Sequence, residues 1–185
     1  MDEDRKLYQE FLNGNKTSFD KIKDKYIDRM IYFIYGFVRK IEIAEDLAQD
    51  VFVYILVNKN NYNFDYSLNT YLYMIAKFRA FNYLKSIKHK KEISLEEYQD
   101  LETNDEIIEI EDIIFNNIRD KNLKNAISKL NAKQSRIIYL SKIEDLKIKD
   151  ISKILDISEN DVKISIHRGI KKLKNIIGEE DDLYV

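Results

Sequence analysis

The sequence predicts an all-α protein of two small helical domains joined by an acidic linker, with a helix-turn-helix as the C-terminal domain. The 185 residues include no proline and only 4 glycines, and this composition favours long uninterrupted helices over strands joined by tight turns. Apolar residues recur at steps of three and four, the period of a helix face. Charge is gathered into blocks, which usually mark linkers or interaction tails.

The charge blocks suggest where the domains begin and end. Residues 1–91 contain 16 basic and 12 acidic residues, 92–113 contain 10 acidic and no basic residues, and 114–178 contain 15 basic and 7 acidic residues. The middle block is too charged to form a core element by itself. We therefore expect a first domain at 5–91, an acidic linker at 92–117 and a second domain at 118–178.

The composition also excludes several classes of function. There is no cysteine, so disulfide scaffolds, thiol catalysis and cysteine-based zinc sites are excluded. The acidic N-terminus does not resemble a secretory signal, and no apolar stretch has the length of a membrane span. His89 and His167 lack ligand spacing, and no glycine-rich phosphate loop occurs. We expect a cytoplasmic protein without a metal, a cofactor or a catalytic centre.

The first domain is expected to contain three helices. The first has its apolar stripe at Phe19, Ile22, Tyr26, Met30, Phe33 and Phe37, and Thr17 with Asp20 resembles a capping box at its start. The second covers 44–56, with a stripe that ends at Ile55 and Leu56. A polar stretch rich in Asn and Tyr then occupies 58–67, and the third helix starts at about Leu68.

The third helix combines basic and aromatic residues. No acidic residue occurs between Asp65 and Glu92, whereas lysines and an arginine alternate with Tyr and Phe. Single-stranded nucleic acid is bound by such surfaces, because bases stack on rings and phosphates meet cations. An amphipathic helix whose aromatic residues are core gives the same pattern, so both interpretations stay open.

The segment 148–174 predicts a helix-turn-helix. Asp156 tolerates the left-handed conformation that the turn demands, Ser152 is small enough for a close helix crossing, and Ser158 with Asp161 forms a capping box. The second helix then presents Lys163, Ser165, His167, Arg168, Lys171 and Lys172. An ordinary helical hairpin with a solvated basic face is the alternative, but turn, cap and charge together favour DNA binding in a major groove.

Four segments in order resemble the extracytoplasmic-function sigma factors, the smallest members of the main sigma family of bacterial RNA polymerase. They are GNKTSFDKIKDKY at 14–26, AEDLAQDVFVYIL at 44–56, SLNTYLYMIAKFRAFNYLKS at 67–86, and the stretch 126–174. The resemblance implies a subunit that directs RNA polymerase to promoters and performs no catalysis. It implies core RNA polymerase and promoter DNA as partners, and it raises an anti-sigma factor as a third.

The resemblance also implies roles for particular residues. By this resemblance, the residues that bind the polymerase are Asp46, Gln49, Asp50 and Tyr54. Binding of the minus-ten element falls to Asn60, Asn61, Tyr62, Asn63, Phe64, Tyr71, Lys77, Arg79, Asn82, Lys85 and Lys88. Binding of the minus-thirty-five element falls to Lys147, Lys149, Lys163, Ser165, His167, Arg168, Lys171 and Lys172.

The chain departs from the family pattern in places, and two other functions compete. Ile164 and Ser165 stand where the family usually has Ser-Arg, and Leu130-Asn131 where it has Leu-Pro, so the promoter sequence is open. A stand-alone helix-turn-helix regulator is one alternative, but it would not need the docking helix. A nuclease is the other, but its acidic residues would have to cluster in a basic groove, and here they are segregated in the linker.

Overall fold

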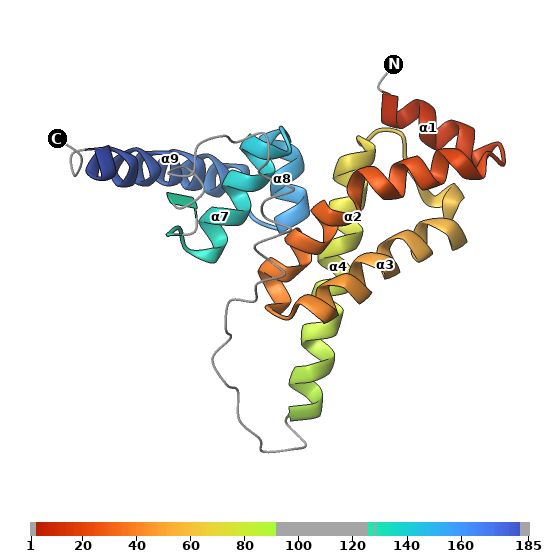
Figure 1. Cartoon of the computed structure of the whole chain (residues 1–185), viewed down its shortest axis with the longest axis horizontal. Helices are drawn as coiled ribbons and strands as arrows, with labels where there is room; N and C mark the ends of the chain where they lie inside the picture. Colours follow the sequence, from red (N-terminus) through yellow and green to blue (C-terminus); the bar gives the residue numbers. More distant parts are fainter. Residues whose placement is uncertain (1–2, 92–125, 128, 182–185) are drawn as a thin grey trace. The chain divides into compact units, whose positions relative to one another are not determined.

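A computed structural model describes residues 3–91, 126–127 and 129–181, and these residues form helices joined by turns, with no strand among them (Figure 1). The chain divides into two compact units, Met1–Ile113 and Ile114–Val185, called here the N-terminal and C-terminal units. The all-α fold predicted from the sequence is confirmed. The expected linker, 92–117, lies outside the described residues.

The described residues of the N-terminal unit form four α-helices and one short 3-10 turn. They are α1 (Glu3–Leu12), α2 (Lys16–Val38), α3 (Ile41–Val57), η1 (Lys59–Asn61) and α4 (Leu68–Lys91). The long helix α2 packs against α1, α3 and α4, and α3 also packs against α4 (Figure 1). The last helix begins at Leu68, as the sequence predicts. Helix α1 was not predicted, and it carries Tyr8, which is completely buried.

Aromatic side chains form much of the core of the N-terminal unit. The stripe predicted on α2 is buried except for Phe37, which is half-buried. Phe33 meets Tyr73 of α4 edge-on with ring centroids 4.8 Å apart, and Tyr8 meets Tyr62 at 4.6 Å. Such pairs contribute about 0.5–1.5 kcal/mol beyond the area that they bury. The rings therefore join α4 to α2, and α1 to the segment that precedes α4.

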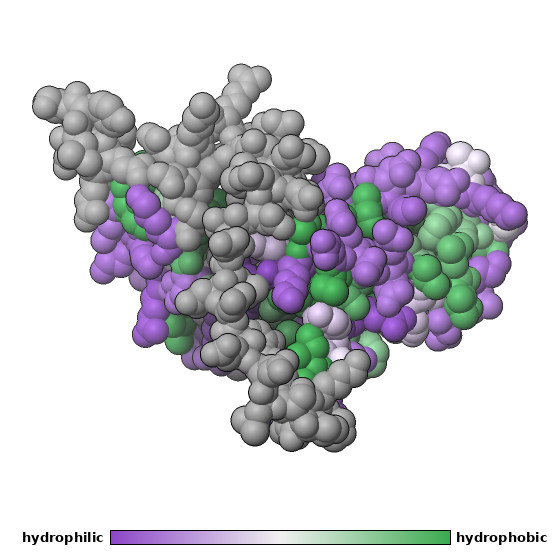
Figure 2. All heavy atoms as spheres, turned by 60° about the horizontal axis from the view of Figure 1, so that its bottom comes forward, coloured by the Kyte–Doolittle hydropathy of each residue, from purple (hydrophilic) through white to green (hydrophobic). Residues whose placement is uncertain are grey.

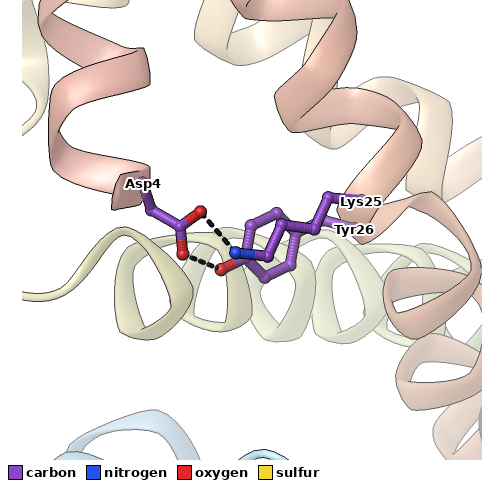
Figure 3. A network of polar contacts seen from close by, with 3 residues as sticks. All are labelled: Asp4, Lys25 and Tyr26. Atoms are coloured by element: carbon purple, nitrogen blue, oxygen red, sulfur yellow. Dashed lines mark hydrogen bonds and ion pairs between the residues drawn. The ribbon is translucent and has the colours of Figure 1, made fainter. Parts of the chain in front are cut away.

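Polar contacts attach α1 to the rest of the unit. The buried Asp4 carboxylate accepts hydrogen bonds from Tyr26 Oη at 2.5 Å and from Lys25 Nζ at 2.6 Å (Figure 3). A buried carboxylate needs such partners, because desolvation of an unpaired charge is costly. On the same helix, Arg5 donates to the carbonyl of Phe64 and Tyr8 Oη to that of Lys59. Helix α1 thus supports the segment that follows α3.

The start of α2 differs from the prediction. Asn15 is the N-cap, and its side chain accepts a hydrogen bond from the backbone of Ser18. Thr17 lies exposed in the first turn and is not the cap. Asparagine is at least as good an N-cap as threonine, and with Asn15 as the cap the helix starts two residues earlier than the capping-box pattern indicated.

The C-terminal unit combines short helices with one long helix. It contains α7 (Ala132–Ile138), the π-helical turn η2 (Tyr139–Ile143), α8 (Ile148–Leu155) and α9 (Glu159–Asp181), and both α7 and α8 pack against α9. At Gly169 of α9, a Cβ atom would lie only 3.0 Å from side-chain atoms of Ile138. The missing side chain therefore lets α7 and α9 cross closely. The rest of this core is mainly aliphatic: Ile137, Leu140, Ile151, Ile154, Val162 and Leu173.

Candidate polymerase and nucleic-acid interfaces

Helix α3 has a buried side and an outward side that is half acidic and half apolar. The line Ala44, Ala48, Val51 and Ile55 is buried against the unit. The acidic part of the outward side contains the predicted docking residues Asp46, Gln49 and Asp50, all exposed. The apolar part follows one turn later, with Val53, Leu56 and Val57 exposed by 54%, 48% and 76%.

This apolar part corrects the sequence interpretation of Leu56. The residue was expected on the buried stripe, and it does follow the buried Phe52 by four residues, but its side chain is exposed at the edge of that stripe, beside Val53. Figure 2 shows hydrophobic surface of this kind, coloured green, on the N-terminal unit. Three large apolar side chains exposed on successive turns of one helix are typical of a protein contact rather than of solvated surface.

Tyr54 lies at the side of α3 that faces α4. It is half-buried, and the guanidinium carbon of Arg79 is 5.4 Å from the centroid of its ring, within range of a cation–π interaction. Arg79 Nε is buried and makes no hydrogen bond to the residues that the structure describes. The structure therefore brings a predicted docking residue into contact with a predicted strand-binding residue.

The segment between α3 and α4 has an aromatic base and a polar rim. Tyr62 is only 5% exposed; its ring lies between those of Tyr8 and Tyr71, and its hydroxyl donates to the carbonyl of Tyr66. Phe64 is half-buried beside it, with ring centroids 4.6 Å apart. The predicted residues that reach solvent here are Asn60, Asn61 and Asn63. Tyr62 thus shapes the segment instead of projecting from it.

The tyrosines under this segment stay uncharged at physiological pH. Burial is the main cause that raises the pKa of Tyr71, and nearby Tyr54 adds to it. Burial, followed by the neighbouring tyrosines, likewise raises the pKa of Tyr8. Tyr71 Oη is buried without a hydrogen-bond partner among the described residues. A buried hydroxyl without a partner lowers the stability of the fold by about 1–3 kcal/mol. The segment therefore keeps one polar group that is not yet hydrogen-bonded within the described part of the chain.

Helix α4 divides its aromatic residues between core and surface. Tyr73 is completely buried, whereas Phe78 and Phe81 are 61% and 50% exposed. The ammonium of Lys77 lies 5.2 Å from the centroid of Phe81. The predicted Asn82, Lys85 and Lys88 are all exposed beyond these rings. The core interpretation therefore holds for Tyr73, whereas nucleic-acid binding by the exposed Phe78 and Phe81 stays a prediction.

The turn between α8 and α9 has the predicted helix-turn-helix geometry. Asp156 adopts the left-handed conformation, with φ 57° and ψ 53°, and its N–H donates to the carbonyl of Ser152. Ser152 Oγ in turn donates to the carbonyl of Ile157 at 2.6 Å. Ser158 Oγ accepts from the N–H of Asp161 and donates to its carboxylate. These bonds fix where α9 begins.

The basic residues of the C-terminal unit differ in how much they are already engaged. Lys147 and Lys149 are exposed where α8 begins, and Lys163, His167, Arg168 and Lys171 are exposed along α9. Ser165 is half-buried. Lys172 is exposed too, but its ammonium donates to the carbonyl of Lys129 at 3.0 Å. It therefore helps to hold α9 against the segment that precedes α7.

Comparison with known families identifies both units. The profile of Sigma-70 region 2 matches residues 23–90, and that of Sigma-70, region 4 matches residues 120–173. The chain belongs to the extracytoplasmic-function sigma factors. It is 26% identical over 176 residues to the ECF RNA polymerase sigma factor SigW of Bacillus subtilis, covering 92% of this chain and 94% of SigW. It is 26% identical over 162 residues to the RNA polymerase sigma factor YlaC of the same organism, covering 86% and 92%.

Solved structures agree with the fold of this sigma factor. CnrH in complex with the cytosolic domain of CnrY matches with a TM-score of 0.61 and 17% identity, over 96% of this chain and 99% of that one. RpoE of Bartonella quintana in complex with the anti-sigma factor NepR matches with a TM-score of 0.60 and 16% identity, over 86% and 96%. A stand-alone helix-turn-helix regulator is not favoured, because the region 2 match covers most of the N-terminal unit.

Several surface residues of the sigma factor were not predicted as site residues. They are Val53, Leu56 and Val57 on α3, Phe78 and Phe81 on α4, and Ile164 on α9, the large apolar side chains exposed among the described residues. A count of helix positions from the buried stripe could have found Val53. Within the described ranges, no helix is long and apolar enough to cross a membrane, and no group of three or more His, Cys, Asp and Glu side chains could hold a metal ion.

Proposed function

We propose that this sigma factor binds core RNA polymerase through α3 and places the enzyme at promoters by binding a minus-ten element with the N-terminal unit and a minus-thirty-five element with the C-terminal unit. It adds sequence choice in the cytoplasm and no catalytic step. In this proposal the two DNA-binding domains extend over 5–91 and 118–178, and the acidic segment 92–117 links them. The observation that carries the proposal is the outward side of α3, which a DNA-binding unit alone would not need.

The composition of that side suits a protein partner with basic and apolar groups. Asp46 and Asp50 offer charge one turn apart, and Val53 and Val57 continue the same line with apolar area. Apolar contacts at an interface supply affinity, while complementary charge guides the encounter and fixes the register. Tyr54 supports this surface from the side that faces α4, where its ring contacts Arg79.

The minus-ten element is proposed to bind as a melted strand. Exposed asparagines on the segment after α3 offer hydrogen bonds to a base edge, and the tyrosines beneath give them a rigid uncharged support. Phe78 and Phe81 offer stacking surfaces, and Lys85 and Lys88 offer cations for phosphates. An exposed ring and an exposed cation on one helix suit unpaired bases better than a closed duplex.

The minus-thirty-five element is proposed to bind as duplex. A helix-turn-helix places its second helix in the major groove, with the residues near the N-terminus of that helix on base edges. Arg168 can bond bidentately to guanine, while Lys147, Lys149 and Lys171 can meet phosphates. An anti-sigma factor is a further partner in this proposal, and the complex of RpoE with the anti-sigma factor NepR supplies the precedent.

Reversal of one charge on α3 tests the proposal. Asp50→Lys should weaken binding to core polymerase by about 2 kcal/mol, because like charges brought together at an interface cost several kcal/mol. The measurement is a pull-down titration of the full chain against core enzyme. Asp24→Lys is the matched control, since Asp24 is an exposed aspartate of α2. The Asp24→Lys variant should bind core polymerase with the affinity of the native chain.

Both variants should keep the helical circular-dichroism signal of the native chain, since both positions are exposed. If Asp50→Lys binds core polymerase as tightly as Asp24→Lys does, α3 is not the docking helix. If the native chain does not bind core polymerase at all, the function itself is wrong.

A further inference from the structure

Ile164 occupies an unusual place for an apolar side chain. It is 39% exposed, and it is the one large apolar side chain of the C-terminal unit's described residues that is exposed to this degree. The other five of that kind lie on α3 and α4, on the surfaces proposed for polymerase and for melted DNA. A single exposed apolar residue needs no explanation by itself. Its position on α9 is what calls for one.

The helix geometry puts Ile164 in the middle of the outward face of α9. Val162, Gly169 and Leu173 are buried and define the side of the helix that faces the unit. With about 100° per residue, Ile164 points away from that side. Residues three, four and seven positions later share its face, and these are the exposed His167, Arg168 and Lys171.

The residues beside Ile164 in sequence lie on the flanks of this face. Lys163 and Ser165 are each turned about 100° from Ile164, in opposite directions. Lys163 is exposed and Ser165 is half-buried. In a groove, a flanking lysine is placed for a phosphate, whereas the central residue is placed for a base edge. The central residue near the start of α9 is therefore an isoleucine and not a cation.

We propose that Ile164 reads the C5-methyl group of a thymine in the minus-thirty-five element. This inference rests on the proposed function. The thymine methyl is the apolar group that base pairs present in the major groove, and apolar side chains recognise it by direct contact. Ile164 has no polar side-chain atom, so it cannot distinguish bases by hydrogen bonds. Its contribution is the choice of thymine over cytosine, one turn before Arg168 makes polar contacts.

Removal of one methyl group from the DNA tests this contact directly. A minus-thirty-five duplex is first selected by footprinting of the reconstituted holoenzyme, and each thymine is then replaced singly by deoxyuridine, which pairs identically but lacks the methyl. The native protein should lose about fourfold in affinity at one thymine, the effect of one methyl-sized group returned to water. Ile164→Ser should bind the thymine and deoxyuridine duplexes equally.

Two variants serve as controls. Ile164→Val keeps an apolar side chain and should keep part of the discrimination. Lys171 lies seven residues after Ile164 on the same face of α9. Lys171→Ala should weaken binding to both duplexes and preserve the ratio of the two affinities. Ile164 is partly exposed, so Ile164→Ser should fold, and its thermal unfolding should match that of the native chain.

Three results would overturn the inference. The first is that no thymine-to-deoxyuridine change weakens the native protein. The second is that such a change weakens Ile164→Ser as much as the native protein. The third is that the selected element contains no thymine opposite α9. A holoenzyme that footprints normally but shows any of these results disproves only the role of Ile164, whereas a holoenzyme without any promoter footprint disproves the proposed function.

Discussion

Helices α4 and α9 are both long and carry exposed basic residues, yet their outward faces suit different forms of DNA. The face of α4 carries two exposed phenylalanines among lysines, and that of α9 carries a single isoleucine among His, Arg and Lys. Flat rings can stack on bases only when the bases are unpaired, whereas a compact aliphatic group fits the floor of a major groove. Basic charge alone therefore does not identify which form of DNA a helix binds. The side chains between the charges do.

The two helices are also held in different ways. Phe33 and Phe37 of α2 meet Tyr73 and Phe81 of α4 edge-on, so aromatic contacts position the helix along its length. Helix α9 is positioned by its first turn, through the capping hydrogen bonds of Ser158, and by the close crossing at Gly169. A helix fixed at one end and one crossing point can present a defined register to a groove.

The largest effect in this comparison should come from the exposed rings of α4. Phe78→Ala should weaken binding of holoenzyme to a template with a pre-melted minus-ten element by about 1–3 kcal/mol, the cost of one lost base–aromatic stack. Binding of an isolated minus-thirty-five duplex should not change. Phe78 is the cleaner choice, because Phe81 also packs against Phe37.

The control for this prediction is Tyr73→Phe. Tyr73 is the buried aromatic residue of the same helix, so its conservative variant changes the core and not the surface. Equal losses on pre-melted and fully duplex templates after Phe78→Ala would remove the distinction between α4 and α9.

The next effect should come from Arg168. Arg168→Ala should cost about 1–3 kcal/mol on a cognate minus-thirty-five element and much less on a scrambled duplex, because a bidentate contact to guanine is specific for the base. Fluorescence anisotropy with the two duplexes measures both values. If the loss is the same on both, Arg168 contacts phosphate and the outward face of α9 does not read bases through it.

The sequence was sufficient where the structural signal is local. The left-handed turn needs Asp156, the cap needs Ser158 with Asp161, and all of them lie within six consecutive residues. The start of α4 at Leu68 follows similarly from the polar stretch before it. Turn chemistry and capping act over a few positions, so one sequence is enough to predict them.

The sequence was insufficient where distant residues cooperate. Helix α1 has few apolar residues, and its buried Asp4 is stable only because Lys25 and Tyr26 of α2 bind it. Tyr62 lies in a polar stretch and becomes buried only because Tyr8 of α1 and Tyr71 of α4 meet it. Such burial depends on tertiary contacts that periodicity cannot show.

The smallest effect should separate two neighbouring lysines of α9. Lys171 is exposed on the face that carries Arg168, whereas the ammonium of Lys172 is bonded to the carbonyl of Lys129. Lys171→Ala should make the negative slope of log K against log salt shallower by about one unit, because one phosphate contact is lost. Lys172→Ala should change that slope less and instead lower the stability of the C-terminal unit by about 0.5–1.5 kcal/mol, the net contribution of one hydrogen bond.

Salt titrations of duplex binding and urea unfolding of each variant measure the two quantities separately. From the sequence alone, both lysines were expected to contact DNA. If the two variants change the salt slope equally and leave unfolding unaffected, the bond from Lys172 to Lys129 breaks when DNA binds. The outward face of α9 would then be wider than the line from Ile164 to Lys171, and α9 would gain its affinity from several spread charges rather than from a few contacts to base edges.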